Sequence, residues 1–134
     1  MKHRRKICLS ICCVVTIVGI VLAVWIARRM VHTPARRALP YSASQIREHK
    51  IDLFVDYVYL MKADITSKQF DNFVLQMSMT KPSTTESWNS WDLKVPSWWN
   101  PPTSPAVIYI REVEDDTQQA TYHNGSIFFQ AWSE

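Results

Sequence analysis

The sequence predicts an α+β fold, in which an N-terminal transmembrane helix precedes a small antiparallel sheet of about four to five strands packed against one helix. Three observations predict it. Residues 7–27 form a run of 21 residues without a charge. A capping pattern precedes an apolar helical face at about residues 67–77. Alternating apolar residues around an Asn-Gly pair predict a C-terminal meander.

The uncharged run at residues 7–27 has the length of a membrane-spanning helix. At roughly 1.5 Å per residue it extends about 31 Å, close to the thickness of the apolar core of a bilayer. A basic head at residues 1–6 precedes it. A cleaved signal peptide would have a shorter apolar run and a small-residue cleavage site. We therefore expect an uncleaved single-pass anchor that contacts the lipid bilayer through residues 7–27.

The basic residues on either side of the run predict its orientation. Four Lys or Arg residues precede the run and four follow it, but the N-terminal four lie closer together. Because cytoplasmic flanks carry the excess of Lys and Arg, we expect the N-terminus in the cytoplasm. The C-terminal domain is then extracytoplasmic.

The formal net charge of +3 is the sum of two unlike regions. Residues 1–40 hold eight basic residues and no acid, and residues 28–40 are interpreted as a basic juxtamembrane linker. Residues 41–134, the predicted soluble domain, hold seven basic and twelve acidic residues, a net charge of −5. Nucleic-acid binding needs a basic face, so we expect no nucleic-acid partner.

Glycine and cysteine exclude several kinds of site. The chain has two glycines, Gly19 and Gly125, so it has no Gly-rich phosphate loop, dinucleotide fingerprint or nucleophile elbow. Its three cysteines lie within the first thirteen residues, which excludes a disulfide or C-x-x-C site further along. We expect no cofactor.

The segment at residues 51–65 is rich in Val, Ile, Phe and Tyr, which favour strands. With a period of two, Tyr57 and Met61 share one face while Val58 and Leu60 share the other. We predict a strand at residues 54–64. A helix is the alternative, because acids recur every fourth residue from 48 to 56. Residues 46–50 are interpreted as a preceding strand or a short helical turn.

A helix start follows at Thr66. Gln69, three residues later, completes a capping box, and Ile65 and Phe70 are spaced for a hydrophobic staple. The residues that recur on one helical face are Phe70, Phe73, Val74 and Met77. We interpret these apolar side chains as core.

The last third of the soluble region predicts consecutive strands. Residues 107–113 have a strand pattern and 114–116 a turn. Asn124-Gly125 predicts a tight hairpin turn, because both central positions of such a turn need a positive φ. Strands are therefore expected on either side of it, at residues 120–123 and 126–132.

Residues 78–105 form a Trp/Pro-rich loop, in which five prolines exclude a regular helix. Its tryptophans are a candidate interaction surface, since Trp is enriched at binding hot spots. They are Trp88, Trp91, Trp98 and Trp99. The interpretation that we favour is that Trp98 and Trp99 close the side of a small core, because small domains rely on large aromatic residues for burial.

The ionisable residues match no catalytic or metal motif. The acids at 112–116 lack the glycine and the alternating acids of a calcium loop, so we interpret them as a solvated turn. His49 and His123 are the domain's histidines and too few for zinc. No local motif supports a Ser-His-Asp arrangement. We therefore predict no catalytic residue and no metal ligand.

Four stretches carry a family resemblance: LPYSAS at 39–44, DYVYLMKADIT at 56–66, FDNFV at 70–74 and SWWNPP at 97–102. They resemble a pattern in uncharacterised small bacterial envelope proteins with a single-pass membrane anchor. The resemblance implies a Lys-Ala strand, a Phe-x-x-Phe helix and a Trp/Pro segment before a final hairpin. It favours the strand at 54–64 and a bacterial setting, and it implies no active site.

These observations predict a membrane-anchored, non-catalytic binding or accessory module of the cell envelope, with an envelope or membrane protein as partner. An immunity or inhibitor-type protein is the first alternative, which small size and an acidic surface would suit. A hydrolase that uses carboxylates is the second, with Asp52, Asp56, Asp115 and His123 as the residues to test.

Overall fold

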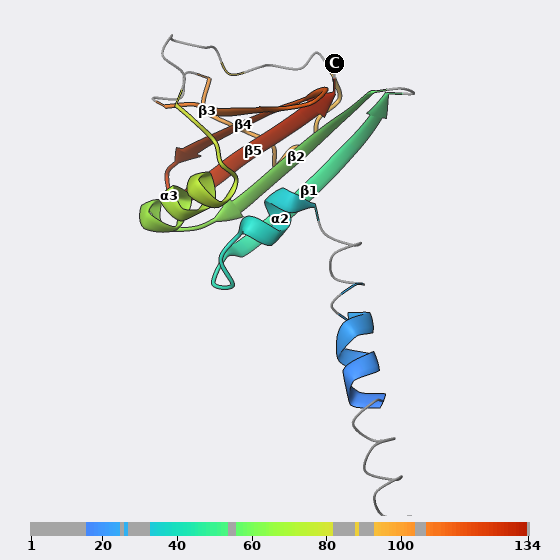
Figure 1. Ribbon diagram of the computed structural model, residues 1–134. Helices are drawn as coiled ribbons and strands as arrows, with labels where there is room; N and C mark the ends of the chain where they lie inside the picture. Colours follow the sequence, from blue (N-terminus) through green and yellow to red (C-terminus); the bar gives the residue numbers. More distant parts are fainter. Residues whose placement is uncertain are drawn as a thin grey trace, which may run out of the picture. The chain divides into compact units, whose positions relative to one another are not determined.

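The computed structural model describes residues 16–24, 26, 33–53, 56–81, 88, 93–103 and 107–133. The chain divides into two compact units, Met1–Thr33 and Pro34–Glu134. Each unit is described by itself, with the element labels of Figure 1.

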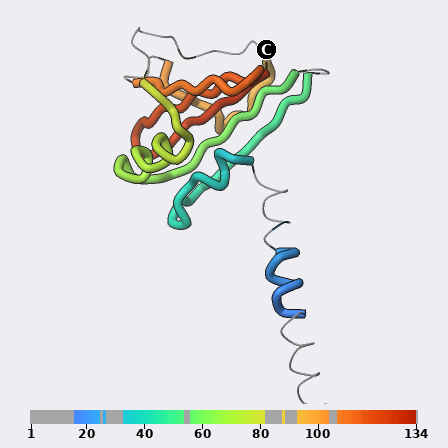
Figure 2. The backbone as a smooth tube through the Cα atoms, viewed as in Figure 1, coloured from blue at the N-terminus to red at the C-terminus, as the bar shows by residue number. Residues whose placement is uncertain are grey.

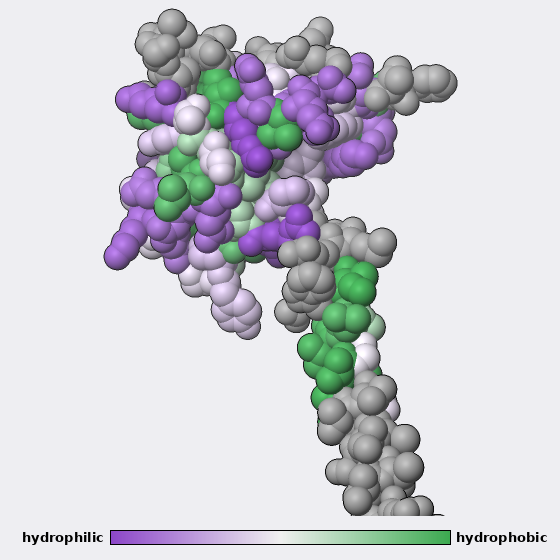
Figure 3. Space-filling view, viewed as in Figure 1, coloured by the Kyte–Doolittle hydropathy of each residue, from purple (hydrophilic) through white to green (hydrophobic). Residues whose placement is uncertain are grey.

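The first unit is helical at residues 16–24 and 26. The large apolar side chains along this helix are exposed, and the surface of the helix is largely hydrophobic (Figure 3). They are Ile17, Val18, Ile20, Val21, Leu22, Val24 and Ile26. Among the described residues, no helix combines the length and the apolarity needed to cross a bilayer. The predicted span at 7–27 extends past them, since residues 7–15, 25 and 27 lie outside the described part of the chain.

The second unit is built on a five-stranded sheet in the order β1-β2-β5-β4-β3, with every neighbouring pair antiparallel (Figure 1). This arrangement confirms the α+β class and the C-terminal meander. The strands are β1 (Ser44–Leu53), β2 (Asp56–Asp64), β3 (Tyr109–Val113), β4 (Asp116–His123) and β5 (Ser126–Ser133).

Two strands are longer than predicted or were not assigned, and the bounds of the other three agree with prediction to within two residues. The segment left open at residues 46–50 is part of β1, which pairs with β2 from Ser44 to Leu53. The predicted strand at 120–123 was too short, because β4 begins at Asp116. Residues 116–119 are polar, which hid the strand, but they pair with β5 on one side and, from Asp116 to Gln119, with β3 on the other.

Helix α3 (Ser67–Gln76) follows β2 directly, and its capping box is as predicted. The Gln69 backbone N–H donates to Thr66 Oγ1 at 3.3 Å, and the Thr66 N–H donates to Gln69 Oε1 at 2.8 Å. These bonds satisfy backbone donors that the first turn of a helix leaves unpaired. Met77, predicted as the last helical residue, is the C-cap.

A short helix, α2 (Pro34–Ala38), lies within the stretch that was interpreted as a linker. Its Ala35 side chain is buried, and Arg36 Nε lies 3.6 Å from Glu48 Oε2 on β1. The compact unit therefore starts at Pro34 rather than at Tyr41. Residues 28–32 of the predicted linker lie outside the described residues.

Both faces of the sheet are covered, as the alternation in β2 requires. Tyr59 and Met61 face a core that includes α2 and α3, which lie on one face (Figures 1 and 2). Val58 and Leu60 face a second core, which residues of the Trp/Pro-rich loop close from the other side. The described part of the loop is thus a third layer of the fold.

Candidate functional site

The structure brings three of the four predicted tryptophans together on the second face of the sheet. The Trp88 and Trp99 ring centroids lie 6.3 Å apart, and those of Trp98 and Trp99 lie 6.1 Å apart. Trp91 lies outside the described residues. These three described rings pack as one group against strands β2 and β5.

Two of these rings are core rather than surface. Trp88 and Trp99 are only 9% and 8% exposed, and the Trp99 ring meets Phe128 of β5 edge-on at 5.8 Å. Trp98 is partly exposed. Of the predicted interaction surface, Trp98 is the described residue whose ring remains available to a partner.

Trp98 lines a hollow of about 270 Å³ between the loop and the first two strands. We call this hollow the Trp98 pocket; it is lined by Gln45, Arg47, Lys62, Asp64, Ser97, Trp98 and Asn100. Strands β1 and β2 supply the charged side chains, and the loop supplies the aromatic ring and an amide. Most small-molecule sites are lined chiefly by apolar side chains with a few placed polar groups. This pocket differs, because Trp98 is its one aromatic ring and its other lining residues are polar or charged.

Two positive charges meet in the Trp98 pocket. Arg47 of β1 lies directly opposite Lys62 of β2 in the strand register. Like charges at opposed positions of an antiparallel pair are destabilising. The register also shifts between Ser44 and Arg47, and the bulge residue Gln45 has a φ of 49°. The fold therefore holds an unfavourable charge pair and an unfavourable backbone conformation at one place.

Lys62 and Asp64 are both held in position by neighbours. Lys62 Nζ donates to Asn100 Oδ1 at 2.9 Å and lies 4.9 Å from the centre of the Phe128 ring. Ser126 Oγ donates to Asp64 Oδ1 at 2.7 Å. Arg47, by contrast, makes no ion pair or side-chain hydrogen bond with any residue that the structure describes. The pocket thus has one oriented cation, one oriented anion and one arginine available for a ligand.

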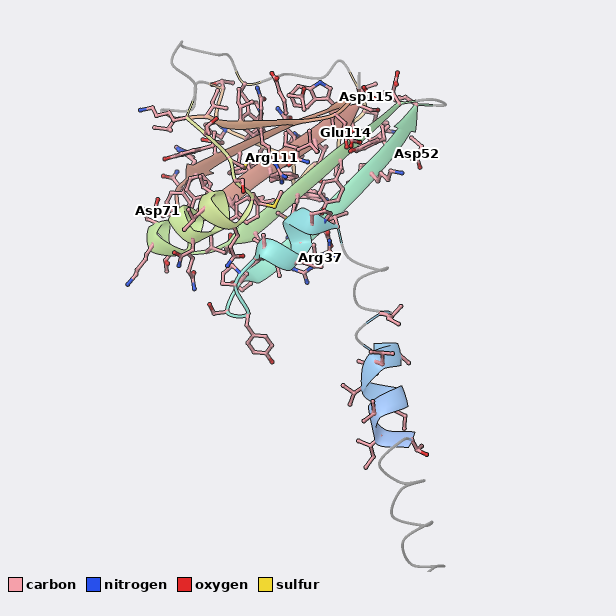
Figure 4. All side chains as sticks on the ribbon, in the orientation of Figure 1. Arg37, Asp52, Asp71, Arg111, Glu114 and Asp115 are labelled. Carbon is pink, nitrogen blue, oxygen red and sulfur yellow. The ribbon has the colours of Figure 1, made fainter. Side chains whose placement is uncertain are left out.

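A second hollow of about 260 Å³ lies at the β3–β4 turn. It is lined by Glu112, Glu114, Asp115, Asp116 and Thr117. Figure 4 shows Glu114 and Asp115 at the same end of the sheet as Asp52. Among the described residues no group of three His, Cys, Asp or Glu side chains is arranged to hold a metal ion.

Asp116 of this acidic hollow is bonded to Tyr57. The Tyr57 hydroxyl donates to Asp116 Oδ2 at 2.8 Å, across strand β5. Burial, followed by the hydrogen bond and the negative charge of Asp116, raises the pKa of the Tyr57 hydroxyl from 10.0 to about 12. The hydrogen bond links β2 to β4 across β5. A phenol is already a donor at neutral pH, and the raised pKa extends this range to higher pH.

Of the residues considered for a hydrolase, His123 lies at the opposite end of β4 from Asp115, which immediately precedes that strand. His123 ends β4 and Asp116 begins it. Seven residue steps along an extended strand separate the two by about 24 Å. His49 lies in the middle of β1, opposite Leu60. Neither histidine is therefore next to the acids at the β3–β4 turn.

Arg47, Lys62 and Asn100 belong to no catalytic, metal or binding motif that is visible in the sequence. Arg47 and Lys62 become neighbours only through the β1–β2 pairing, and residues 46–50 were left open between strand and helix. A hairpin centred on residues 54 and 55 would have put these two cations opposite each other. Asn100 follows Trp98-Trp99 directly in the sequence, and that adjacency was the available signal.

Comparison of the chain with protein-family models, with curated proteins and with solved structures finds no match. The candidate site therefore rests on its own geometry.

Proposed function

We propose that this chain is a membrane-anchored, non-catalytic binding module of the cell envelope, and that it binds its partner at the Trp98 pocket. The partner is a component of the envelope or of the membrane. The observation that carries the proposal is the Trp98 pocket itself, where a partly exposed aromatic ring adjoins two closely spaced cations.

The anchor is proposed from the uncharged run at residues 7–27, with the N-terminus in the cytoplasm and the folded unit outside. Its described part supports this, because apolar side chains such as Ile17 and Val21 are 61% and 63% exposed. A helix with this much exposed apolar surface is stable in lipid and poorly soluble in water. Membrane tethering would hold the pocket close to envelope components.

A binding role rather than catalysis is favoured by the composition of the pocket. It contains Asp64, whose carboxylate already accepts a hydrogen bond from Ser126, and no histidine or cysteine. Nucleophilic catalysis needs a nucleophile next to a base, and general acid–base catalysis needs an acid or base positioned at the reacting proton. Arginine, amide and indole groups supply recognition instead.

Site-specific photo-crosslinking in intact membranes tests this proposal. A benzophenone amino acid replaces Ser97, which is exposed and lines the pocket. The matched control carries it at Leu75, a residue of α3 that is 78% exposed and belongs to neither core. We expect a discrete adduct with an envelope component from position 97 and not from position 75.

The outcome at the two positions decides the proposal. Discrete adducts from position 97 that disappear when Arg47 is changed to Gln would support it. No adduct from position 97, or the same adducts from both positions, would contradict it. A protein, a glycan or another envelope component caught at position 97 would each agree with a binding role there.

A second candidate function is an inhibitor or immunity-type protein, favoured by the acidic hollow at the β3–β4 turn. Four carboxylates line that hollow, and they would suit a basic protein partner. Coexpression with a basic toxin encoded next to this chain tests it. Protection that is lost in a Glu114→Gln, Asp115→Asn variant would support this function, and unchanged protection would contradict it.

A further inference from the structure

We propose that the ligand of the Trp98 pocket is an acidic sugar, meaning a pyranose ring that carries a carboxylate. The inference rests on the proposed function, because it names the ligand class of the same site. Three features of the pocket carry it: two cations against the single carboxylate of Asp64, an aromatic ring, and amide and hydroxyl groups around them.

The two cations are the reason for expecting a carboxylate on the ligand. Arg47 and Lys62 lie opposite each other on one face of the β1–β2 pair, where like charges repel. Lys62 is fixed by Asn100, whereas the guanidinium of Arg47 makes no ion pair or hydrogen bond within the described residues. A carboxylate between the two would relieve the repulsion, and arginine can bind it through two parallel hydrogen bonds.

The two cations lie on a unit whose net charge is negative, and this contrast bears on the charge of the ligand. The compact unit at Pro34–Glu134 has nine basic and twelve acidic residues, a net charge of −3. The two cations and one carboxylate of the pocket give it a net charge of +1, opposite in sign to the unit as a whole. The net charge of the unit disfavours a polyanion such as a nucleic acid, which would be repelled beyond the pocket.

The other lining residues are the reason for expecting a ligand ring that carries hydroxyl groups. Trp98 offers a flat apolar surface, which its edge-on contact with Trp99 at 90° keeps oriented. Gln45, Ser97 and Asn100 supply amide and hydroxyl groups that both donate and accept hydrogen bonds. A ring with one apolar face and a border of hydroxyl groups matches both surfaces.

The size of the pocket agrees with a single sugar ring. The pocket is open to solvent, and its volume of about 270 Å³ is enough to admit a small ligand. One pyranose with its carboxylate fills such a space, whereas a long apolar chain would leave the polar walls without partners.

Titration of the full chain in detergent micelles tests the inference. Four probes are compared by isothermal calorimetry: N-acetylmuramic acid, glucuronic acid, the neutral sugar N-acetylglucosamine, and inorganic phosphate. We expect an acidic sugar to bind at least about tenfold more tightly than the neutral sugar and phosphate, with affinity falling as salt is added.

Two charge-matched variants locate the binding. Arg47→Gln removes one cation from the pocket, and Arg111→Gln removes one from β3, outside it. Arg47 is exposed, so its replacement by a side chain of similar shape leaves the fold intact. We expect Arg47→Gln to weaken acidic-sugar binding at least about tenfold and Arg111→Gln to leave it unchanged.

Each outcome decides the inference. Binding of N-acetylmuramic acid alone supports it and assigns the ligand to glycans with a carboxylate on a side arm. Binding of glucuronic acid alone supports it and assigns the ligand to uronates. Equal binding of phosphate or of the neutral sugar overturns it, as does no binding of any sugar. If the acidic-sugar inference fails in this way, a protein adduct from position 97 would still support the proposed binding function.

Discussion

The Trp98 ring meets the Trp99 ring edge-on, with centroids 6.1 Å apart and planes at 90°. Trp99 is buried against β5, while Trp98 is partly exposed and lines the pocket. Two neighbouring residues of one sequence motif thus have different roles, one in the pocket wall and one in the core. The first is held in the pocket wall because the second is fixed in the core.

The core role of Trp99 predicts a large loss of stability in Trp99→Ala. Removing a buried indole leaves a cavity against Phe128 and Trp88, and such changes cost about 3–5 kcal/mol. Thermal unfolding of the full chain in micelles measures it. Trp98→Ala is the comparison: its ring is already partly exposed, so the loss should be under about 2 kcal/mol. Equal losses in the two variants would contradict the division of roles.

The bond between Tyr57 and Asp116 predicts a pH-dependent stability difference. Tyr57→Phe removes a hydrogen bond to a carboxylate, at a cost of about 1 kcal/mol below pH 10. The folded phenol has a pKa of about 12 and the ordinary value is 10.0, so the unfolded chain releases this proton first. The advantage of the wild type is therefore complete below pH 10 and is lost as the pH rises to about 12.

Urea unfolding of both proteins at several pH values measures this difference. Subtracting the Tyr57→Phe curve removes the titration of every other group. A difference that stays constant between pH 10 and 12 would show that Tyr57 does not donate to Asp116.

The β4–β5 turn predicts opposite responses at its two central residues. Gly125 has a φ of +82°, and an added Cβ would meet nothing within 4 Å. Gly125→Ala should cost about 1 kcal/mol, entirely from backbone conformation. Asn124 has a φ of 47°, so Asn124→Gly should be neutral or slightly stabilising. Denaturant midpoints check both, and a neutral Gly125→Ala would contradict the left-handed turn.

The proposed anchor predicts that residues 7–27 alone hold the chain in the membrane. Removing them should move the protein entirely to the soluble fraction, because the rest of the sequence contains no other uncharged apolar run of about 20 residues. A variant that keeps the run and lacks residues 1–6 should stay in the membrane. Retention of the protein that lacks 7–27 would indicate a different attachment.

The strands and α3 could be predicted because their signals are local. The Thr66–Gln69 capping box and the Asn124-Gly125 turn each need residues within a few positions of one another. The polar start of β4 was missed, since residues 116–119 become strand by pairing on both sides and not through their own propensity. Helix α2 was missed for a similar reason: Ala35 is helical and buried through contacts with the distant core.

The candidate site was predicted only in part. A cluster of tryptophans is visible in the sequence, but which indole is buried depends on Phe128 and the sheet behind it. The charged half of the pocket comes from a cross-strand pair, Arg47 and Lys62, fifteen positions apart. Such a pair becomes apparent only once the hairpin register is known.

Hydrogen–deuterium exchange of the full chain in nanodiscs, with and without an envelope extract, tests the binding site most directly. We predict protection on addition of the extract at residues 44–50 and 93–103, which line the Trp98 pocket from both sides, and none at α3. The Arg47→Gln variant should lose that protection. Protection confined to α3 or to the β3–β4 turn, or no protection anywhere in the folded unit, would contradict a binding site at Trp98.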